Sequence, residues 1–433
     1  MKHHLLPPDV LVAGAGPVGL FQALTLTARG VPVRIVERSP GPGSQSYALA
    51  LHPETLSALA DFDLLASVMR FAHPLERIAL YAEDERVAEL DMGTAHAEFP
   101  YCAVLPQSAL ETILVEALAR RGVEVEWNHR LSELQPAKGE LRGAVQELSQ
   151  RMMGYATSHL DWMVENERPF HVPFVVGADG HRSLTRALGR IPFPEVGPAQ
   201  SFAVFEFETV QAIEPEVRLV FSEKGMSACW PLSTHRCRWS FETTGDGRLA
   251  SLRSKEHDLV QLGADTFARV PPEELGRLLA ERAPFFRAEP ARVEWNVHVK
   301  FERRLADYFN DRRLCLVGDA AHLASPLGMH SMNQGMREAG RLAEVLSHIL
   351  DDGDDRALLE SWDGAARDDW RWLLGHTRVV EATKGVDERL LPYADLLPEC
   401  LPASEAGISA LLATLGMQVQ HRTHAGVSAF PPV

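Results

Sequence analysis

The sequence predicts a mixed α/β protein in which a domain of alternating strands and helices carries an inserted antiparallel sheet. Three observations support this fold class. A short apolar strand near the amino terminus runs into a glycine-rich turn and a helix, and residues 192–299 alternate apolar and polar side chains. Beyond residue 350 the chain follows a helical period to about Leu373, with further helical pieces such as Gly407–Val419. We therefore expect two sheet-containing domains and a C-terminal helical segment.

The first strand and the turn after it have the pattern of a dinucleotide-binding site. Asp9–Ala13 is a short strand, and Gly14, Gly16 and Gly19 follow it at the spacing of a Rossmann-like turn. Gly14 makes the tight turn, and Gly16 lets a pyrophosphate approach the backbone. Gly19 lets the helix pack closely on the strand. The first domain is therefore expected to be Rossmann-like.

The residues around this turn complete the pattern. Pro17 begins a helix, which includes Val18 and ends before Gly30. Glu37 follows the second strand and is expected to accept a hydrogen bond from an adenosine ribose hydroxyl. Arg38 is either a phosphate contact or a solvated neighbour, and both interpretations stay open.

A second stretch with functional character is Arg313–Leu350. Leu314–Val317 reads as a buried strand, and Gly318 and Asp319 then place a carboxylate at its carboxyl end. An irregular loop with Pro326 and Gly328 follows, and a long helical pattern begins at about Met332. The helix start would direct N–H donors and partial positive charge at a ligand edge that becomes negative.

A third strand end carries another aspartate. The strand Phe174–Val176 leads to Asp179, and Ser183 and Arg186 are expected within the helix that follows. A capping turn is the simple interpretation. A second cofactor contact is the alternative.

Composition limits the partners. The chain of 433 residues has a net charge of −16 and five scattered cysteines. The charge argues against nucleic acid and anionic membranes, and the cysteines predict neither disulfides nor a metal site. We expect a cytoplasmic protein, because Val10–Leu26 fits a nucleotide-binding turn better than a signal peptide.

The predicted domains are discontinuous. Residues 1–72, 104–190 and 300–350 would form the nucleotide domain, and 73–103 with 191–299 the antiparallel domain, including a helix at Pro271–Arg282. Residues 351–433 would be helical. A helix is also expected over Leu51–Leu65 and another over Ser108–Arg120, while Gln146–Glu165 looks partly helical without an assigned role.

Taken together, the chain resembles the single-component flavoprotein aromatic hydroxylases of the para-hydroxybenzoate hydroxylase type, over about residues 9–370. The resemblance rests on the three glycine- and aspartate-bearing turns in order. It implies non-covalent FAD, held across the two domains, with backbone N–H groups of Met332 and Asn333 facing the flavin pyrimidine. The cofactor-binding set it implies is Gly14, Gly16, Pro17, Val18, Gly19, Glu37, Arg38, Gln107, Asp179, Gly318, Asp319, Pro326, Gly328, Met332 and Asn333.

The chain departs from this family at three places. Tyr47-Ala48 stands where arginine and alanine are usual, and Met329 to Met332 replaces a glycine-rich run. Glu338-Ala339 stands where aspartate and alanine are usual. The first change puts a cofactor phosphate or nicotinamide contact in doubt, and the second places bulkier residues beside the flavin.

The resemblance implies that NADPH or NADH reduces the flavin and that O2 adds at its C4a atom. The terminal oxygen then passes to an aromatic, usually phenolic, carbon. Candidate bases are His330, Tyr47 and His52, whereas His322 belongs to the motif and suits a structural role. With a single glycine fingerprint for FAD, the reductant would visit a groove near Asp179, Arg182 and Arg186.

Two other classes remain open. A flavin-dependent reductase or halogenase could use the same cofactor site, although the tryptophan-halogenase stretch Gly-Trp-x-Trp-x-Ile-Pro is absent from the sequence. A non-catalytic flavin- or substrate-binding protein is the other alternative. The substrate cannot be read from the sequence, and whether the chain forms a homodimer stays open.

Overall fold

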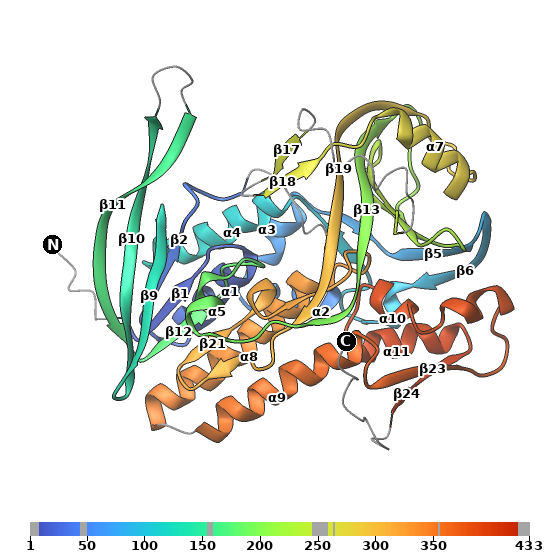
Figure 1. Ribbon diagram of the computed structural model, residues 1–433. Helices are drawn as coiled ribbons and strands as arrows, with labels where there is room; N and C mark the ends of the chain where they lie inside the picture. The colour runs from blue at the N-terminus through green and yellow to red at the C-terminus, as the bar shows by residue number, and fades with distance from the viewer. Residues whose placement is uncertain are drawn as a thin grey trace, which may run out of the picture.

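The first sheet has six strands in the order β20-β21-β12-β1-β2-β8 (Figure 1). The structure is a computed structural model and describes residues 8–43, 50–153, 159–244, 259–262, 265–353 and 356–422. The strands are β1 (Val10–Ala13), β2 (Val33–Glu37), β8 (Val125–Trp127), β12 (Phe174–Gly177), β20 (Asn310–Asp311) and β21 (Leu314–Leu316). All except β20 run parallel, and β1, β12 and β21 are buried along their whole length. Such continuous apolar strands are typical of a parallel sheet, and the mixed α/β class is confirmed.

Helix α1 (Pro17–Ala28) packs against both α4 (Gln107–Ala119) and α8 (His330–Asp352). Glycines also let α1 and α8 pack closely on the turns after β1 and β21. A Cβ atom at Gly19 would stand 2.0 Å from the Gly14 carbonyl oxygen, and one at Gly335 would stand 2.9 Å from Gly318 Cα. The turns after β1 and β21 are therefore held directly against the helices that follow them.

The second sheet is antiparallel for most of its width and lies beside the first (Figure 1). Its order is β17-β18-β19-β13-β16-β15-β14-β5-β6, with β22 (His322–Leu323) paired to β19. The strands are β5 (Arg77–Ala82), β6 (Glu85–Asp91), β13 (Glu195–Thr209), β14 (Glu216–Phe221), β15 (Ser227–Ser233), β16 (Arg236–Glu242), β17 (Leu259–Leu262), β18 (Asp265–Ala268) and β19 (Pro290–Leu305).

The two faces of this sheet pack against different partners. Phe205, Phe207 and Trp239 lie in a cluster with Leu275 and Leu278 of α7 (Glu273–Arg282). Residues of the opposite face, such as Phe202, Val204 and Trp230, belong to the core shared with the first domain. The antiparallel sheet is thus held against the parallel domain by its own apolar alternation.

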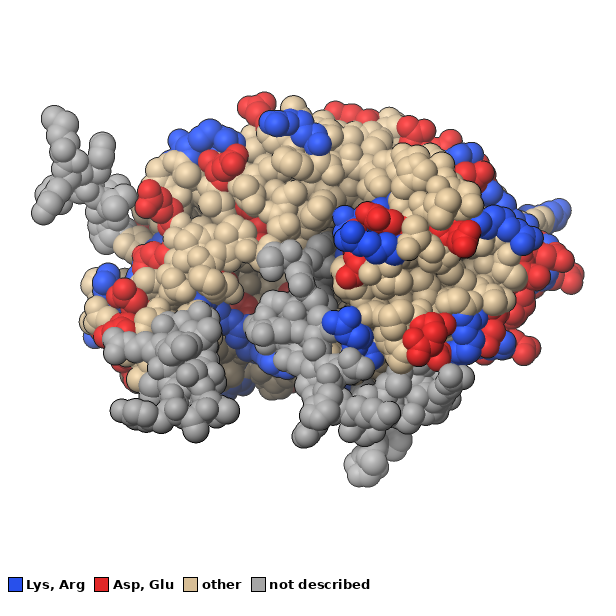
Figure 2. Space-filling model, turned by 90° about the horizontal axis from the view of Figure 1, so that it is seen from above, with Lys and Arg blue, Asp and Glu red and all other residues tan. Residues whose placement is uncertain are grey.

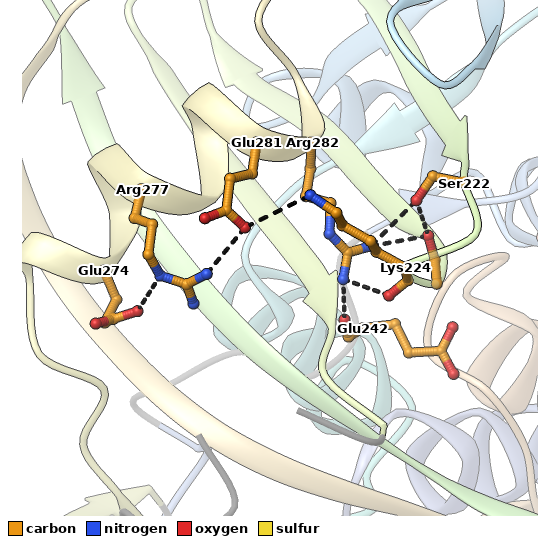
Figure 3. Close-up of polar contacts among 8 residues, drawn as sticks. Ser222, Lys224, Glu242, Glu274, Arg277, Glu281 and Arg282 are labelled. Atoms are coloured by element: carbon orange, nitrogen blue, oxygen red, sulfur yellow. Dashed lines mark hydrogen bonds and ion pairs between the residues drawn. The ribbon is translucent and has the colours of Figure 1, made fainter. Parts of the chain in front are cut away.

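Arg282 fixes α7 to the loop between β14 and β15 (Figure 3). Arg282 is 7% exposed, and its guanidinium donates hydrogen bonds to Ser222 Oγ at 3.2 Å and to the Gly225 carbonyl at 3.0 Å. It also donates to the carbonyls of Lys224 and Glu242, the latter at 3.1 Å. The helix end is therefore attached through three backbone carbonyl groups.

The prediction of partly helical structure at Gln146–Glu165 is wrong. Strands β9 (His129–Ala137), β10 (Glu140–Met153) and β11 (His159–Val172) form a three-stranded antiparallel sheet, whose long hairpin extends from one side of the molecule (Figure 1). A bulge after Glu147 shifts the register, and Trp162, Met163 and Val164 are all exposed although they are consecutive. The two-residue hydrophobic alternation that identifies strands is therefore missing.

The helix expected over Leu51–Leu65 is also wrong as a single element. Leu51 lies in β3 (Ala50–Leu51), and two short helices follow, α2 (Pro53–Ala60) and α3 (Leu65–Met69). Strand β3 joins β7 (Cys102–Val104) and β4 (His73–Leu75) in a small sheet. A 3-10 turn, Met92–Thr94, lies between β6 and β7.

The C-terminal region contains helices and a strand pair. The helices are α9 (Arg356–Leu373), α10 (Leu397–Cys400) and α11 (Glu405–Thr414), with a 3-10 helix at Glu388–Tyr393. The predicted helical piece Gly407–Val419 is wrong after Thr414. Gly416 adopts a φ of +75°, and β24 (Met417–His421) then pairs with β23 (Arg378–Ala382).

The division predicted at residue 300 falls inside β19, which pairs with β13 as far as Arg304. No helix within the described residues is long and apolar enough to cross a membrane. On the described part of the face in Figure 2, acidic and basic side chains are interspersed.

Candidate functional site

The turn after β1 has the geometry of a phosphate-binding site. Gly14 has a φ of +107°, and a Cβ atom there would stand 2.2 Å from the Ala178 carbonyl oxygen. A Cβ atom at Gly16, in contrast, would have no atom within 4 Å. Gly16 caps α1 without a side-chain hydrogen bond, and Pro17 is the first helical residue. The helix start, including Val18, is thus open on the side from which a phosphate would approach.

Glu37 supports this turn from the end of β2. Its Oε2 accepts the Ala15 N–H at 2.8 Å, and its Oε1 accepts the Ser39 N–H at 2.9 Å. Each carboxylate oxygen can accept a further bond, so the predicted ribose contact is compatible with this support. Arg38 is exposed.

Asp179 caps the short helix α5 (Leu184–Leu188). Its carboxylate accepts hydrogen bonds from the Ser183 hydroxyl and from the N–H and hydroxyl of Thr185, both at 2.9 Å. Ser183 is the N-cap of α5 and lies outside the helix, contrary to the prediction. The capping interpretation therefore has direct geometric support, while the cofactor role of Asp179 stays a prediction.

Arg186 links α5 to the turn after β21. Its Nη1 donates to the Ala320 carbonyl at 2.8 Å, and its Nη2 donates to the His181 carbonyl at 2.9 Å. The guanidinium carbon lies 3.9 Å from the centre of the Phe193 ring. Arg186 is thus engaged within the protein, and this was not foreseen from the sequence.

Asp319 lies in a 3-10 turn, Gly318–Ala320, directly after β21. Since β1, β12 and β21 are parallel neighbours, Gly14, Asp179 and Asp319 lie at one edge of the sheet. This is the edge at which open α/β sheets bind their ligands. Burial raises the pKa of Asp319 above its ordinary value, and the proximity of His322 and His181 opposes this effect.

A buried polar network supports the Asp319 turn. Glu338 of α8 and His322 are both fully buried, and His322 Nε2 lies 2.8 Å from Glu338 Oε2. Glu338 also accepts hydrogen bonds from the Trp370 indole and, at 3.4 Å, from the Gly318 N–H. The structure thus agrees with a structural role for His322, and it shows that Glu338 accepts several bonds at once.

Helix α8 begins at His330, earlier than the predicted Met332. Its N-cap, Met329, adopts the left-handed conformation with φ +54° and ψ +36°, and it provides no side-chain cap. This conformation costs a residue with a Cβ atom about 1–2 kcal/mol relative to glycine. The uncapped helix start leaves backbone N–H groups for an electron-rich ligand edge.

Asn333 attaches this helix start to the chain around residue 50. Its Oδ1 accepts the His52 N–H and the Thr55 hydroxyl, both at 2.8 Å. Its Nδ2 donates to the carbonyls of Ala50 at 2.9 Å and Met329 at 2.7 Å. The Asn333 side chain is therefore fully used in positioning. Because α8 begins at His330, the Asn333 N–H pairs within the helix, and only the N–H groups up to Met332 remain for a ligand.

The other predicted cofactor residues have these positions. Gln107 Nε2 donates to Glu111 Oε1 at 2.7 Å. Pro326 is half-buried, and Gly328 is packed so closely that a Cβ atom would stand 2.4 Å from the Glu399 carbonyl oxygen. Met332 is buried.

The structure brings together His52 and His330, two of the three candidate bases. Their rings meet edge to face with centroids 5.1 Å apart, and His52 Nε2 lies 2.8 Å from the Gly328 carbonyl oxygen. Burial lowers the pKa of His52 to about 3, and it lowers the pKa of His330 well below its ordinary value. Both rings are therefore neutral near pH 7. The third candidate, Tyr47, lies outside the described residues.

These features together define a flavin-nucleotide-binding α/β protein. The open approach at Gly16, the carboxylate of Asp319 and the uncapped start of α8 fit the pyrophosphate, the ribitol and the ring of FAD, respectively.

The comparisons with known proteins agree with this assignment. Residues 8–369 match the family described as FAD binding domain. The chain is 28% identical over 430 residues to the 6-methylpretetramide 4-monooxygenase of Streptomyces rimosus, covering 97% of this chain and 69% of that protein. It is 26% identical to the para-nitrophenol 4-monooxygenase of Pseudomonas sp. strain WBC-3, covering 82% of this chain and 81% of that protein.

Solved structures show the same fold. The p-nitrophenol 4-monooxygenase of Pseudomonas putida DLL-E4 superposes with a TM-score of 0.66 at 23% identity, covering 84% of this chain and 85% of that chain. Aklavinone-11 hydroxylase, in a ternary complex with FAD and aklavinone, gives a TM-score of 0.66 at 22% identity, covering 95% of this chain and 73% of that chain.

The chain belongs to the FAD-binding-domain family, that of the FAD-dependent aromatic monooxygenases. The resemblance inferred from the sequence, the FAD cofactor and the enzyme class are thereby confirmed.

Proposed function

We propose that the chain hydroxylates a phenolic aromatic compound, with NADPH or NADH as the electron donor and O2 as the oxygen source. Relatives named for 6-methylpretetramide, para-nitrophenol and anhydrotetracycline support an aromatic substrate that carries hydroxyl groups or fused rings. The observation that carries the proposal is the uncapped start of α8 at the same sheet edge as Asp319.

In this proposal the chain binds and orients the cofactor. Backbone N–H groups at the start of α1 bind the pyrophosphate, and Asp319 accepts a hydrogen bond from a ribitol hydroxyl. The N–H groups at the start of α8, up to that of Met332, face the pyrimidine edge of the ring, where a helix terminus stabilises negative charge by about 0.3–1 kcal/mol when exposed and more when buried. Bound FAD supplies electron transfer from the nicotinamide and the activation of oxygen.

The surrounding residues exclude water and hold the loop in place. The segment from Ser325 to Met332 is mostly buried, and the Gly328 carbonyl is fixed by His52. A dry wall at this position protects a reactive oxygen species from hydrolysis. We assign His52 and His330 to positioning this wall, whereas the base that deprotonates a phenol is Tyr47 or bulk solvent.

The nicotinamide cofactor would bind transiently at the surface near Asp179 and Arg182. Since Arg186 is engaged with Ala320 and Phe193, it contributes less to this groove than its charge suggests. We also propose the discontinuous domain division given above, a cytoplasmic location and a homodimer.

The test is NADPH oxidation by the purified protein with a panel of phenols. The proposal requires oxidation that depends on O2 and is stimulated by an aromatic compound, with a product one oxygen atom heavier. A product lacking added oxygen would instead identify a reductase. FAD binding without any turnover would identify a binding protein.

A further inference from the structure

The loop between β22 and α8, residues 324–329, is held at two points. At its start, β22 pairs with β19 through Arg304 and Leu305. Near its end, Gly328 packs against α10, which lies beyond the residues 8–369 that match the family. We call this segment the flavin loop, because the proposed function places FAD at the helix that follows it.

The contact between Gly328 and α10 is close. A Cβ atom at Gly328 would stand 2.4 Å from the Glu399 carbonyl oxygen and 2.5 Å from His330 Nε2. Gly328 therefore lies between the backbone of α10 and the first side chain of α8. All four residues of α10, Leu397–Cys400, are buried. Since packed interiors transmit displacement, a shift of α10 must move Gly328.

The side chain of Glu399 joins α10 to the antiparallel sheet. Arg303 of β19 donates from Nη2 to Glu399 Oε1 at 2.7 Å and to the Leu374 carbonyl at 3.3 Å. The two charged side chains are only 12% and 11% exposed. Burial raises the pKa of Glu399, and the neighbouring Arg303 and Arg378 oppose this effect. Removing one partner of such a buried pair leaves the other charge uncompensated, which is strongly destabilising.

We propose that Glu399 is a positioning residue for the flavin, which transmits the position of β19 through α10 to Gly328 of the flavin loop. Its carboxylate is held by Arg303, while its carbonyl group packs against the loop. The antiparallel sheet thus holds the flavin loop both through β22 and through this ion pair. The inference rests on the proposed placement of the flavin at the start of α8.

The consequence is a link between the ion pair and FAD affinity. Without the pair, the flavin loop can occupy positions that do not fit the flavin. The apparent dissociation constant of FAD then rises by the same factor as the fitting fraction of the protein falls.

The experiment measures release of FAD from the loaded full chain on serial dilution, together with the visible absorption spectrum of the bound flavin. Glu399→Gln keeps the shape of the side chain and removes its charge, and Arg303→Met removes the partner. The matched control is Glu216→Gln on β14. Glu216 is also fully buried and is paired with two arginines, Arg86 at 2.9 Å and Arg218 at 3.1 Å.

We expect the dissociation constant of FAD to rise by about tenfold in Glu399→Gln and in Arg303→Met. The double variant should bind FAD no more weakly than the weaker single variant, because both changes break the same pair. The absorption band of the flavin should shift in both single variants. Glu216→Gln should unfold at a lower urea concentration but leave FAD affinity and the spectrum unchanged. If Glu399→Gln affects FAD no more than Glu216→Gln does, the proposal is wrong.

Gly328→Ala separates this inference from the placement of the flavin, since its methyl group would press directly on the Glu399 carbonyl. If Gly328→Ala weakens FAD binding and Glu399→Gln does not, the flavin lies at the loop and only the role of Glu399 is refuted. If neither variant changes FAD binding or the spectrum, the placement of the flavin at the start of α8 is refuted as well. No turnover is measured, so the result is independent of the test of hydroxylation.

Discussion

Replacing Asn333 by alanine tests whether its side chain holds the start of α8. Asn333 is 2% exposed, and its side-chain amide makes four hydrogen bonds, two accepted and two donated. Its removal leaves the His52 N–H and the Ala50 carbonyl without their partner, and both residues are buried. The Thr55 hydroxyl can rotate toward another acceptor, so we do not count it.

An unpaired buried donor or acceptor costs about 1–3 kcal/mol, and two such groups give an expected destabilisation of about 2–6 kcal/mol. The loss is concentrated at the helix start that faces the flavin. We therefore also expect weaker FAD retention, because the start of α8 loses its attachment to the chain near residue 50.

Urea unfolding of the FAD-loaded protein, followed by tryptophan fluorescence, measures this effect. Ser331→Ala is the matched control, since Ser331 is in the same helical turn and is half-buried. If Asn333→Ala unfolds at the same urea concentration as Ser331→Ala, the hydrogen bonds of Asn333 do not carry the stability assigned to them.

Three further predictions concern separate parts of the molecule. Asp319→Ala should weaken FAD binding by roughly tenfold or more, since it removes a hydrogen-bond acceptor for the ribitol. Asp307→Ala, at an exposed position, is the control. Equal release of flavin from the two variants would contradict the prediction. Burial lowers the pKa of His52 from 6.5 to about 3. The unfolded chain therefore takes up a proton first, and the free energy of unfolding should fall as the pH drops below about 6.5 toward 3. In urea titrations at several pH values, His52→Gln should make the free energy of unfolding less dependent on pH. The same pH dependence in the wild type and in His52→Gln would contradict this prediction. Arg282→Met should lower the free energy of unfolding by about 2–4 kcal/mol, because it removes the shared donor of three half-buried backbone contacts and of the buried Ser222 hydroxyl. Arg277→Met on the same helix, which breaks more exposed ion pairs, should cost about 1 kcal/mol or less. Similar losses in both variants would contradict the role of Arg282 in attaching α7.

The parallel strands and their turns could be predicted because their signals are local. Gly14, Gly16 and Gly19 encode a tight turn within a few residues, and the apolar runs before Asp179 and Asp319 are short and continuous. The hairpin of β10 and β11 could not be predicted in this way. The consecutive residues Trp162, Met163 and Val164 of β11 are all exposed, so no hydrophobic period distinguishes a strand from a helix there.

The positions of the glycine- and aspartate-bearing turns were predicted better than the contacts that support them. Glu338 could be noted as a departure from the family, but its bonds to His322, Trp370 and Gly318 join three elements distant in sequence. The engagement of Arg186 with the Ala320 carbonyl likewise depends on β12 and β21 becoming neighbours. Only tertiary structure establishes such contacts.

The discontinuous first sheet also sets an order for synthesis on the ribosome. Strand β1 and its glycine turn emerge first, but β21 and α8, which pack against β12 and α1, follow only after the whole antiparallel sheet has been made. The apolar surface of α1 that α8 covers therefore stays uncovered while most of the chain is translated. Pairings this distant in sequence form slowly and leave an intermediate prone to aggregation. Since FAD needs both the first turn and the last, its binding would report completion of the fold, and flavin supplied during expression should raise the yield of folded protein.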